Sequence, residues 1–264
     1  MDLQIQNKVA IITGGSRGIG KATALKLAEE GVNIALVSRT ESLLKETKKE
    51  ISKKHPKSKI DYFVCDTHDN IQVEKMVKDV YEKFKSIDIL VNCAAMLPQE
   101  SNIDNFDDKE LIEQIEVKVS GYIRCAKNVA PYMKSKGWGR IVNISGLNAR
   151  SSSNLIGSIR NVSVSSLTKN LADNLGPFGI NVSVVHPGLT YTERSDQMIK
   201  NLSEEKNINF DAAKKLLLEN NSINSIINSS DIANVIAFLV SPLSKSINGD
   251  AISAGGGMKG SVYY

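Results

Sequence analysis

The sequence has too few cysteines to be held together by disulfide bonds. Its 264 residues include only Cys65, Cys93 and Cys125. An odd number of widely separated cysteines matches neither a disulfide framework nor the spacing of zinc ligands. We therefore expect a reduced, intracellular protein without a structural metal. A chain of this length buries roughly three quarters of the surface that its unfolded form exposes, so an apolar core suffices for stability.

Long apolar runs are missing as well. No stretch approaches the roughly 18 apolar residues that a membrane-spanning helix requires. Residues 1–7 contain neither the positive charge nor the apolar run of a signal peptide. These absences predict a cytoplasmic protein that does not bind a membrane.

Basic charge is modest and does not indicate a nucleic-acid partner. The net charge is +4, and much of the excess falls in the lysine-rich run 45–59. Glu46 and Glu50 interrupt this run, and it contains no aromatic residue. Surfaces that bind single-stranded nucleic acid combine positive charge with aromatic side chains for base stacking. We interpret the run as a solvated helix end and loop.

Short β-branched runs alternate with longer segments of helical period, which is typical of strand–helix–strand units around a parallel sheet. The pattern predicts a single α/β domain over residues 1–264, a Rossmann-type doubly wound parallel sheet of about seven strands with helices on both faces. The expected strands are Val9–Thr13, Asn33–Ser38, Ile60–Cys65, Ile87–Asn92, Arg140–Ser145, Asn181–His186 and Ala251–Ala254.

Three of the helices have clear boundaries. Apolar residues at three- and four-residue steps predict a helix over about 69–85. Two longer helices are expected at about 108–134 and at 155–175. The stretch 220–230, rich in Asn and Ser, is interpreted as a loop that ends in a serine N-cap of a last helix.

The segment 13–20, Thr-Gly-Gly-Ser-Arg-Gly-Ile-Gly, follows the first expected strand and opens a helix. Glycines let the backbone turn tightly and approach a pyrophosphate, whose charge the helix N-terminus stabilises. Glycine triplets also occur in ordinary tight turns. Here the strand, turn, helix and second strand follow in the required order, which favours a dinucleotide-binding turn.

The choice of cofactor depends on the end of the second strand. In NAD-binding proteins an acidic residue there accepts a hydrogen bond from the ribose 2′-hydroxyl, but this chain has Ser38 and Arg39. A guanidinium pairs with a 2′-phosphate, which a carboxylate would repel. Arg17 in the glycine turn offers a second cation. We therefore expect NADP(H) rather than NAD(H), unless both arginines are only exposed surface charges.

These motifs resemble the classical short-chain dehydrogenase/reductase family over nearly the whole chain. The turn has the form TGxxxGIG, Asn92 and Ala94 remain from an NNAG motif, and Pro187, Gly188 and Thr192 match PGxxxT. The resemblance implies that Asp66 contacts the adenine and that Thr192 helps to hold the nicotinamide carboxamide. The expected cofactor-binding residues are Gly14, Ser16, Arg17, Gly18, Ile19, Gly20, Arg39, Asp66, Asn92, Ala94, Pro187, Gly188 and Thr192.

The residues that this family uses for catalysis are missing from the expected positions. The family acts through a Tyr, a Lys one helical turn later, a Ser and an Asn. The Tyr position falls on Gly157, the Lys position on Asn161 and the Asn position on Lys118. The Ser position falls on Ser145 or Gly146. Glycine offers no proton, and asparagine offers no charge that would lower the pKa of a neighbour.

No shift of the alignment restores the proton donor, because residues 133–190 contain no tyrosine. Ser145, Lys118 and Tyr191 are candidate catalytic residues. A partly desolvated Lys118 could act as an acid, and Tyr191 would lie beside the nicotinamide. Each also has an ordinary structural interpretation, and His186 is interpreted as a hydrogen-bonded structural residue.

Three functions remain open. The first is an NADP(H)-dependent oxidoreductase acting on a small carbonyl or alcohol through an atypical catalytic centre. The second is a catalytically inactive NADP(H)-binding pseudoenzyme, a sensor or a structural subunit. The third is non-redox chemistry on the same scaffold. Residues 190–227 are expected to form a substrate lid, whose mixed composition favours a small, partly apolar ligand. The resembled family also implies a homodimer or homotetramer, formed by pairing of the two long helices.

Overall fold

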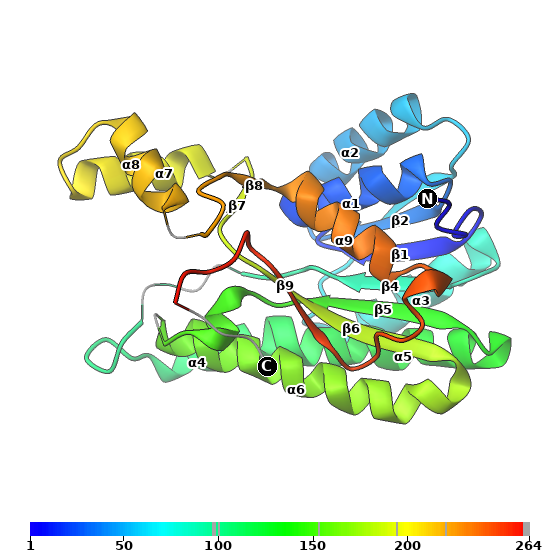
Figure 1. Cartoon of the computed structure of the whole chain (residues 1–264). Helices are drawn as coiled ribbons and strands as arrows, with labels where there is room; N and C mark the ends of the chain where they lie inside the picture. Colours follow the sequence, from blue (N-terminus) through cyan, green and yellow to red (C-terminus); the bar gives the residue numbers. More distant parts are fainter. Residues whose placement is uncertain (97–98, 100, 153, 194, 220, 261–264) are drawn as a thin grey trace.

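The computed structural model of the chain describes residues 1–260 except 97–98, 100, 153, 194 and 220. Its centre is a seven-stranded sheet in the order β3-β2-β1-β4-β5-β6-β9, with every neighbouring pair parallel (Figure 1). The strands are β1 (Val9–Thr13), β2 (Asn33–Ser38), β3 (Ile60–Val64), β4 (Ile89–Asn92), β5 (Gly139–Ile144), β6 (Ile180–Pro187) and β9 (Ala251–Ala254). The predicted fold class is confirmed.

Strands β1 and β4 are mostly apolar because helices cover both of their faces. All five residues of β1 and all four residues of β4 are buried. The sheet order reverses between β1 and β4, as it does in doubly wound folds. Ligands bind such folds in the crevice at the carboxyl ends of the strands where the order reverses.

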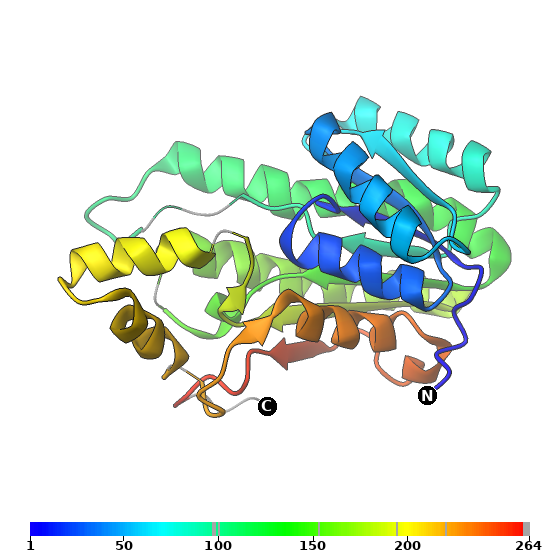
Figure 2. The same ribbon diagram turned by 90° about the horizontal axis from the view of Figure 1, so that it is seen from above.

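Two layers of helices sandwich the sheet (Figures 1 and 2). Buried residues of α1 (Gly18–Glu29), α2 (Glu41–Lys54) and α9 (Ser229–Leu239) form one apolar cluster on the sheet. Residues of α3 (Asn70–Phe84), α5 (Gly121–Lys136) and α6 (Leu155–Leu175) form another. Each layer buries the apolar stripe of its helices, which is the main source of stability in such a domain.

Two helices differ from the sequence-based expectation. The single helix expected at 108–134 is divided into α4 (Asp108–Ile115) and α5 by a π-helical turn at Glu116–Ser120. The last helix, α9, has Asn228 rather than a serine as its N-cap, and Asp231 completes a capping box with it. Asn accepts the cap hydrogen bond as well as Ser does, so the prediction of a cap was right and the residue was wrong.

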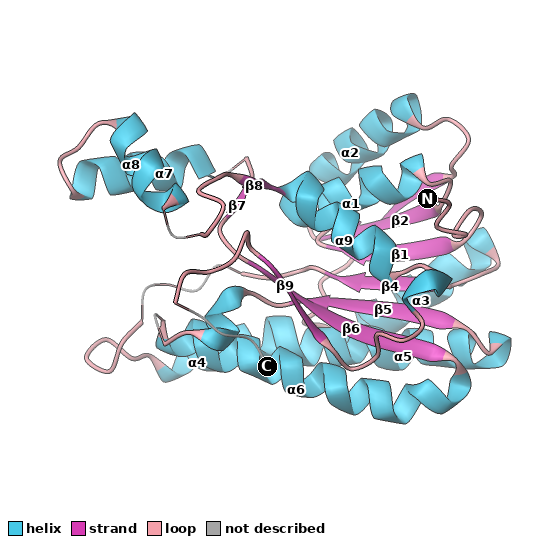
Figure 3. Ribbon diagram, in the orientation of Figure 1, coloured by secondary structure: helices cyan, strands magenta, loops and turns pink. Residues whose placement is uncertain are grey.

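The segment expected as a lid leaves β6 and contains β7 (Thr190–Tyr191), α7 (Ser195–Glu205), α8 (Phe210–Leu218) and β8 (Ile227–Asn228). Strands β7 and β8 pair in parallel as a separate two-stranded sheet. The two helices stand apart from the layered body, beyond one end of the sheet (Figures 2 and 3). None of the helices in the described part of the chain is long and apolar enough to cross a membrane.

Candidate functional site

The glycine turn between β1 and α1 has a backbone that favours glycine. Gly14 and Gly18 have φ angles of 65° and 51°, in the left-handed region that favours glycine. A Cβ atom on Gly20 would lie 2.3 Å from the carbonyl oxygen of Gly14. The turn therefore depends on its glycines, as a close backbone approach to a phosphate requires.

The N-terminus of α1 already holds an anionic group. The N-cap Arg17 has an extended backbone and no capping side-chain bond, so the first amides of the helix lack an internal partner. The backbone N–H of Gly18 donates a hydrogen bond of 3.1 Å to Oε2 of Glu193. The positive end of the helix dipole attracts such a carboxylate for the same reason that it attracts a phosphate.

Polar groups line the neighbouring end of β4. The backbone N–H groups of Cys93 and Ala94 donate to Oγ1 of Thr13, at 3.0 and 3.2 Å. Nδ2 of Asn92 donates to Oδ1 of Asn143 at 2.9 Å. Within the described residues, the buried Oδ1 of Asn92 has no hydrogen-bond partner. A buried acceptor that is left unpaired is one that a ligand would satisfy.

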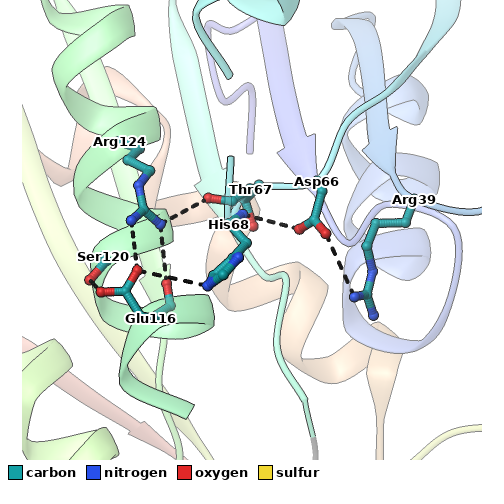
Figure 4. A network of polar contacts seen from close by, with 7 residues as sticks. All are labelled: Arg39, Asp66, Thr67, His68, Glu116, Ser120 and Arg124. Carbon is teal, nitrogen blue, oxygen red and sulfur yellow. Dashed lines mark hydrogen bonds and ion pairs between the residues drawn. The ribbon is translucent and has the colours of Figure 1, made fainter. Parts of the chain in front are cut away.

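The residues expected to read the ribose and adenine lie together at the ends of β2 and β3. Arg39 is exposed, and its Nη1 lies 3.9 Å from Oδ2 of Asp66 (Figure 4). Oγ of Ser38 is buried and has no partner among the described residues. An exposed guanidinium held in a weak surface ion pair is free to exchange its partner for a phosphate.

The chain that follows β6 touches the glycine turn at Thr192. A Cβ atom on Gly18 would lie 3.4 Å from Cγ2 of Thr192. Gly188 packs so closely on the loop after β9 that a Cβ on it would lie 2.8 Å from Cα of Gly255. The structure thus places the glycine turn, the end of β4 and the Pro187–Thr192 motif on the carboxyl side of the sheet.

Lys118 lies in the π-helical turn and is 3% exposed. Its Nζ donates to the carbonyl oxygen of Ser145 at 2.9 Å and to Oδ1 of Asn161 at 3.0 Å. Burial lowers the pKa of Lys118 well below its usual value, and the positive charge of Arg160 lowers it further. Lys118 stands at the expected asparagine position of the family, and Asn161 stands at its expected lysine position. The two side chains are therefore in direct contact.

The other expected catalytic positions hold no free acid. Oγ of Ser145 donates to the backbone oxygen of Asn161 at 2.9 Å. A Cβ on Gly157 would lie 2.7 Å from Oδ1 of Asn154 and 3.4 Å from Nδ2 of Asn148. Two asparagine side chains therefore stand where a tyrosine at Gly157 would project.

The candidate Tyr191 and the nearby His186 also have hydrogen-bond partners within the protein. The hydroxyl of Tyr191 donates to the carboxylate of Asp196, and this hydrogen bond raises the pKa of Tyr191. His186 is 1% exposed, with Nδ1 lying 3.0 Å from the oxygen of Gly146 and Nε2 lying 3.3 Å from Oγ of Ser165. Neither residue is placed as a free proton donor.

A polar network, which the sequence analysis missed, fixes the π-helical turn (Figure 4). The carboxylate of Glu116 accepts from Nη2 of Arg124 at 2.6 Å and from Oγ of Ser120 at 3.0 Å. Nη1 of Arg124 donates to the backbone oxygen of Thr67 at 3.4 Å, and Nε2 of His68 lies 3.9 Å from Oε2 of Glu116. The turn that carries Lys118 is thereby tied to the loop after β3.

The segment 190–227 contains a small hollow of about 30 Å³ that is partly open to solvent. Its wall is mainly apolar and includes Leu189, Met198, Ile199, Leu217 and Ile227, together with Lys214. The described residues contain no cluster of His, Cys, Asp and Glu that could hold a metal ion.

The chain is similar to several known proteins along most of its length. A family model described as enoyl-(acyl carrier protein) reductase matches residues 14–259. A 3alpha-hydroxysteroid dehydrogenase of Mediterraneibacter gnavus is 31% identical over 97% of this chain and 98% of its own length. A 3-oxoacyl-[acyl-carrier-protein] reductase of Staphylococcus epidermidis is 29% identical over 96% and 99%. The crystal structure of L-sorbose reductase from Gluconobacter frateurii, complexed with NADPH and L-sorbose, matches with a TM-score of 0.93 and 27% identity over 99% of this chain and 100% of that one.

Together with the parallel sheet and its glycine turn, these matches define the class. The chain belongs to the short-chain dehydrogenase/reductase family.

Proposed function

We propose that this protein is an NADP(H)-dependent oxidoreductase that acts on a small, partly apolar carbonyl compound or alcohol through a divergent catalytic centre. The observation that carries the proposal is the glycine turn at the N-terminus of α1, where the N–H of Gly18 already binds a carboxylate. Family membership supports a redox reaction, since the relatives named above are reductases and a dehydrogenase.

The residues present fit the cofactor. The glycine turn, where a Cβ on Gly20 would lie 2.3 Å from the oxygen of Gly14, suits a close backbone approach, and the unpaired Oδ1 of Asn92 adds hydrogen-bonding capacity at the carboxyl end of β4. In this assignment the pyrophosphate meets the turn, the 2′-phosphate meets Arg39, and the nicotinamide carboxamide meets Thr192. When bound, NADPH supplies a hydride. The residues that hold it are Gly14, Ser16, Arg17, Gly18, Ile19, Gly20, Arg39, Asp66, Asn92, Ala94, Pro187, Gly188 and Thr192.

Three further properties complete the proposal. We assign the protein to the cytoplasm as a homodimer or homotetramer, and we assign the substrate contact to a lid at residues 190–227. The hollow in this segment, with its apolar wall and Lys214, supports a small partly apolar substrate.

One observation favours the pseudoenzyme as the second candidate. The amide of Asn154 accepts from the N–H of Gly157 at 2.6 Å and fills the space that a tyrosine side chain would need. A chain that had lost catalysis altogether would tolerate such filling. The two candidates share the cofactor and differ in turnover.

Calorimetry of cofactor binding tests the proposal. NADPH should bind at least tenfold more tightly than NADH, about 1.4 kcal/mol, because only NADPH carries the phosphate that Arg39 can pair with. Arg39→Asp should reverse the preference. Lys53→Asp, the same charge change at an exposed lysine of α2, should leave it unchanged.

Equal affinity of the wild type for both cofactors would contradict the NADP(H) assignment. No binding of either would contradict the proposed function as a whole. Binding of NADPH without turnover of any ketone, alcohol or unsaturated carbonyl compound would favour the pseudoenzyme.

A further inference from the structure

Arg160 carries a positive charge that the described part of the protein buries without a counter-charge. It lies on α6 and is 6% exposed. Its two side-chain hydrogen bonds both start at Nη1 and end on neutral oxygens, the backbone oxygen of Met96 at 2.9 Å and Oε1 of Gln114. Nε is buried and has no hydrogen-bond partner among the described residues. Because an arginine keeps its proton in a protein, this donor cannot be removed by a change of protonation.

Lys118 places a second buried amine in the same region. The charge of Arg160 lowers the pKa of Lys118, and Nζ of Lys118 donates only to the neutral oxygens of Ser145 and Asn161. Neither Lys118 nor Arg160 forms an ion pair within the described residues. Glu110 raises the pKa of Arg160, but from beyond ion-pair distance. Buried cations are normally paired, because leaving water without a counter-charge is strongly unfavourable. This region therefore has a place for one anion.

The place of that anion follows from the contacts of the two cations. Met96 belongs to the loop after β4, and Ser145 directly follows β5, so both contacts lie at the carboxyl ends of these strands. The glycine turn and the Pro187–Thr192 motif lie on the same side of the sheet. Ligands of doubly wound folds bind at this edge. An anion beside Nε of Arg160 would therefore be part of a ligand that meets the cofactor.

A carboxylate is the anion that matches Arg160. The N–H groups of a guanidinium form a planar fork that fits the two oxygens of a carboxylate, and such charge-assisted hydrogen bonds are stronger than neutral ones. The bonds of Nη1 to Met96 and Gln114 fix the guanidinium and leave Nε available. The proposed function assigns the phosphates of the cofactor to the glycine turn and to Arg39. The carboxylate at Arg160 would therefore come from the substrate.

We propose that Nε of Arg160 binds a carboxylate of the substrate, which makes the substrate an oxo acid or the corresponding hydroxy acid. This inference rests on the proposed NADP(H)-dependent oxidoreductase function and names its substrate class. In the reduction, the carbonyl carbon receives a hydride from NADPH, the carbonyl oxygen takes a proton from solvent, and the carboxylate is unchanged. Arg160 determines specificity and orientation and transfers no proton.

Calorimetry with a pair of unreactive ligands tests the site without turnover. Butanoate and butanamide have nearly the same shape, but only butanoate is charged. With NADP⁺ bound, the wild type should bind butanoate about tenfold or more tightly than butanamide, because only the carboxylate pairs with the guanidinium. Arg160→Gln should remove this preference. Arg160→Lys, which keeps the charge but not the planar fork, should restore part of it.

Lys169→Gln is the matched control for the loss of one positive charge. Lys169 lies on the same helix at an exposed position, where it pairs with Asp173. This variant should retain the preference of the wild type for butanoate. An equal loss of preference in Lys169→Gln and Arg160→Gln would mean that the effect depends on net charge and would overturn the inference.

A kinetic comparison tests the substrate class. A panel of 2-, 3- and 4-oxo acids is compared with the methyl esters of the same acids. For at least one chain length, kcat/KM of the wild type for the acid should exceed that for the ester about tenfold or more. Arg160→Gln should bring this ratio to about one, mainly by raising KM for the acid, because the contact is made equally in the ground state and the transition state. Its affinity for NADPH should stay unchanged.

Several outcomes would overturn the inference. They are equal binding of butanoate and butanamide, an unchanged preference in Arg160→Gln, or esters that react as well as the acids at every chain length. Carboxylate binding without turnover of any oxo acid would overturn it too, since the anion would then not belong to a substrate. The wild-type comparisons decide the question even if Arg160→Gln fails to fold. Failure of NADPH to bind at all would instead contradict the proposed function.

Discussion

Among single residues, we expect His186 to make the stability of the fold depend on pH. It is 1% exposed, and burial lowers its pKa from 6.5. Its hydrogen bond to Gly146 opposes this effect, and the charges of Arg150 and Lys118 add to it. Because the folded pKa lies below the unfolded value, the unfolded chain binds more protons between the two pKa values. The contribution of His186 is complete above the unfolded pKa and is lost as pH falls through the folded pKa.

We therefore expect the free energy of unfolding to decrease as the pH is lowered from about 7.5 to 5.5. Chemical denaturation at several pH values would measure this decrease. His186→Gln should reduce the slope in this window. Equal slopes for the wild type and His186→Gln would show that His186 does not control acid stability.

The sequence predicted individual site residues unevenly. Gly14, Gly18 and Gly20 could be assigned because their spacing follows from the backbone geometry of the turn itself. The contact between Lys118 and Asn161 could not be predicted, because these residues are 43 positions apart and meet only through packing of α6 on the π-helical turn. The available signal was that Asn161 falls at the family's lysine position and Lys118 at its asparagine position.

At the level of secondary-structure elements, the π-helical turn could not be predicted from the spacing of apolar residues. Residues 116–120 continue the helical pattern of their neighbours, so the sequence predicts one helix. The extra residue of the turn is stabilised by side chains that come from elsewhere in space, notably Arg124 and the loop at Thr67. Such turns occur frequently at functional sites, and this one carries the lysine that contacts Asn161.

Glu193, which follows β7, should compete with the cofactor for the N–H group of Gly18. Glu193 and a cofactor pyrophosphate would accept from the same N–H group, that of Gly18. Removing the charge of the competing carboxylate should therefore tighten cofactor binding. We expect Glu193→Gln to bind NADPH about three- to tenfold more tightly, which corresponds to about 0.7–1.4 kcal/mol.

Calorimetry with NADPH, and with inorganic pyrophosphate as a minimal probe, would measure this effect. Glu205→Gln, at an exposed position at the end of α7, is the matched control. Unchanged or weaker binding by Glu193→Gln would mean that Glu193 does not compete for the turn.

For the whole molecule, the sheet was predictable and the internal structure of the segment 190–227 was not. Strands β1 and β4 are apolar up to their last residues, Thr13 and Asn92, because both faces are covered, and this signal does not depend on distant contacts. The lid helices α7 and α8 mix polar and apolar residues, and the pairing of β7 with β8 joins two-residue strands far apart in the sequence. Strands that short have no periodicity to detect.

Exposed apolar residues on the surface support the prediction that the protein forms an oligomer. Apolar side chains remain exposed on the helices expected to pair: Ile112 is 63%, Ile123 43% and Val162 50% exposed. They lie on α4, α5 and α6, which cover the same face of the sheet (Figure 1). A two-fold axis would place each helix against its mate and bury these residues in both subunits. Light scattering at micromolar concentration should then give the mass of a dimer or a tetramer.

Val162→Glu should weaken this association at least tenfold, because pairing would bury an unpartnered charge in both subunits. The same change at Ile71 is the matched control, since Ile71 is 78% exposed on α3, outside the expected interface. A wild type of monomeric mass would contradict the prediction of an oligomer. A Val162→Glu variant that stays assembled would place the contact on another face.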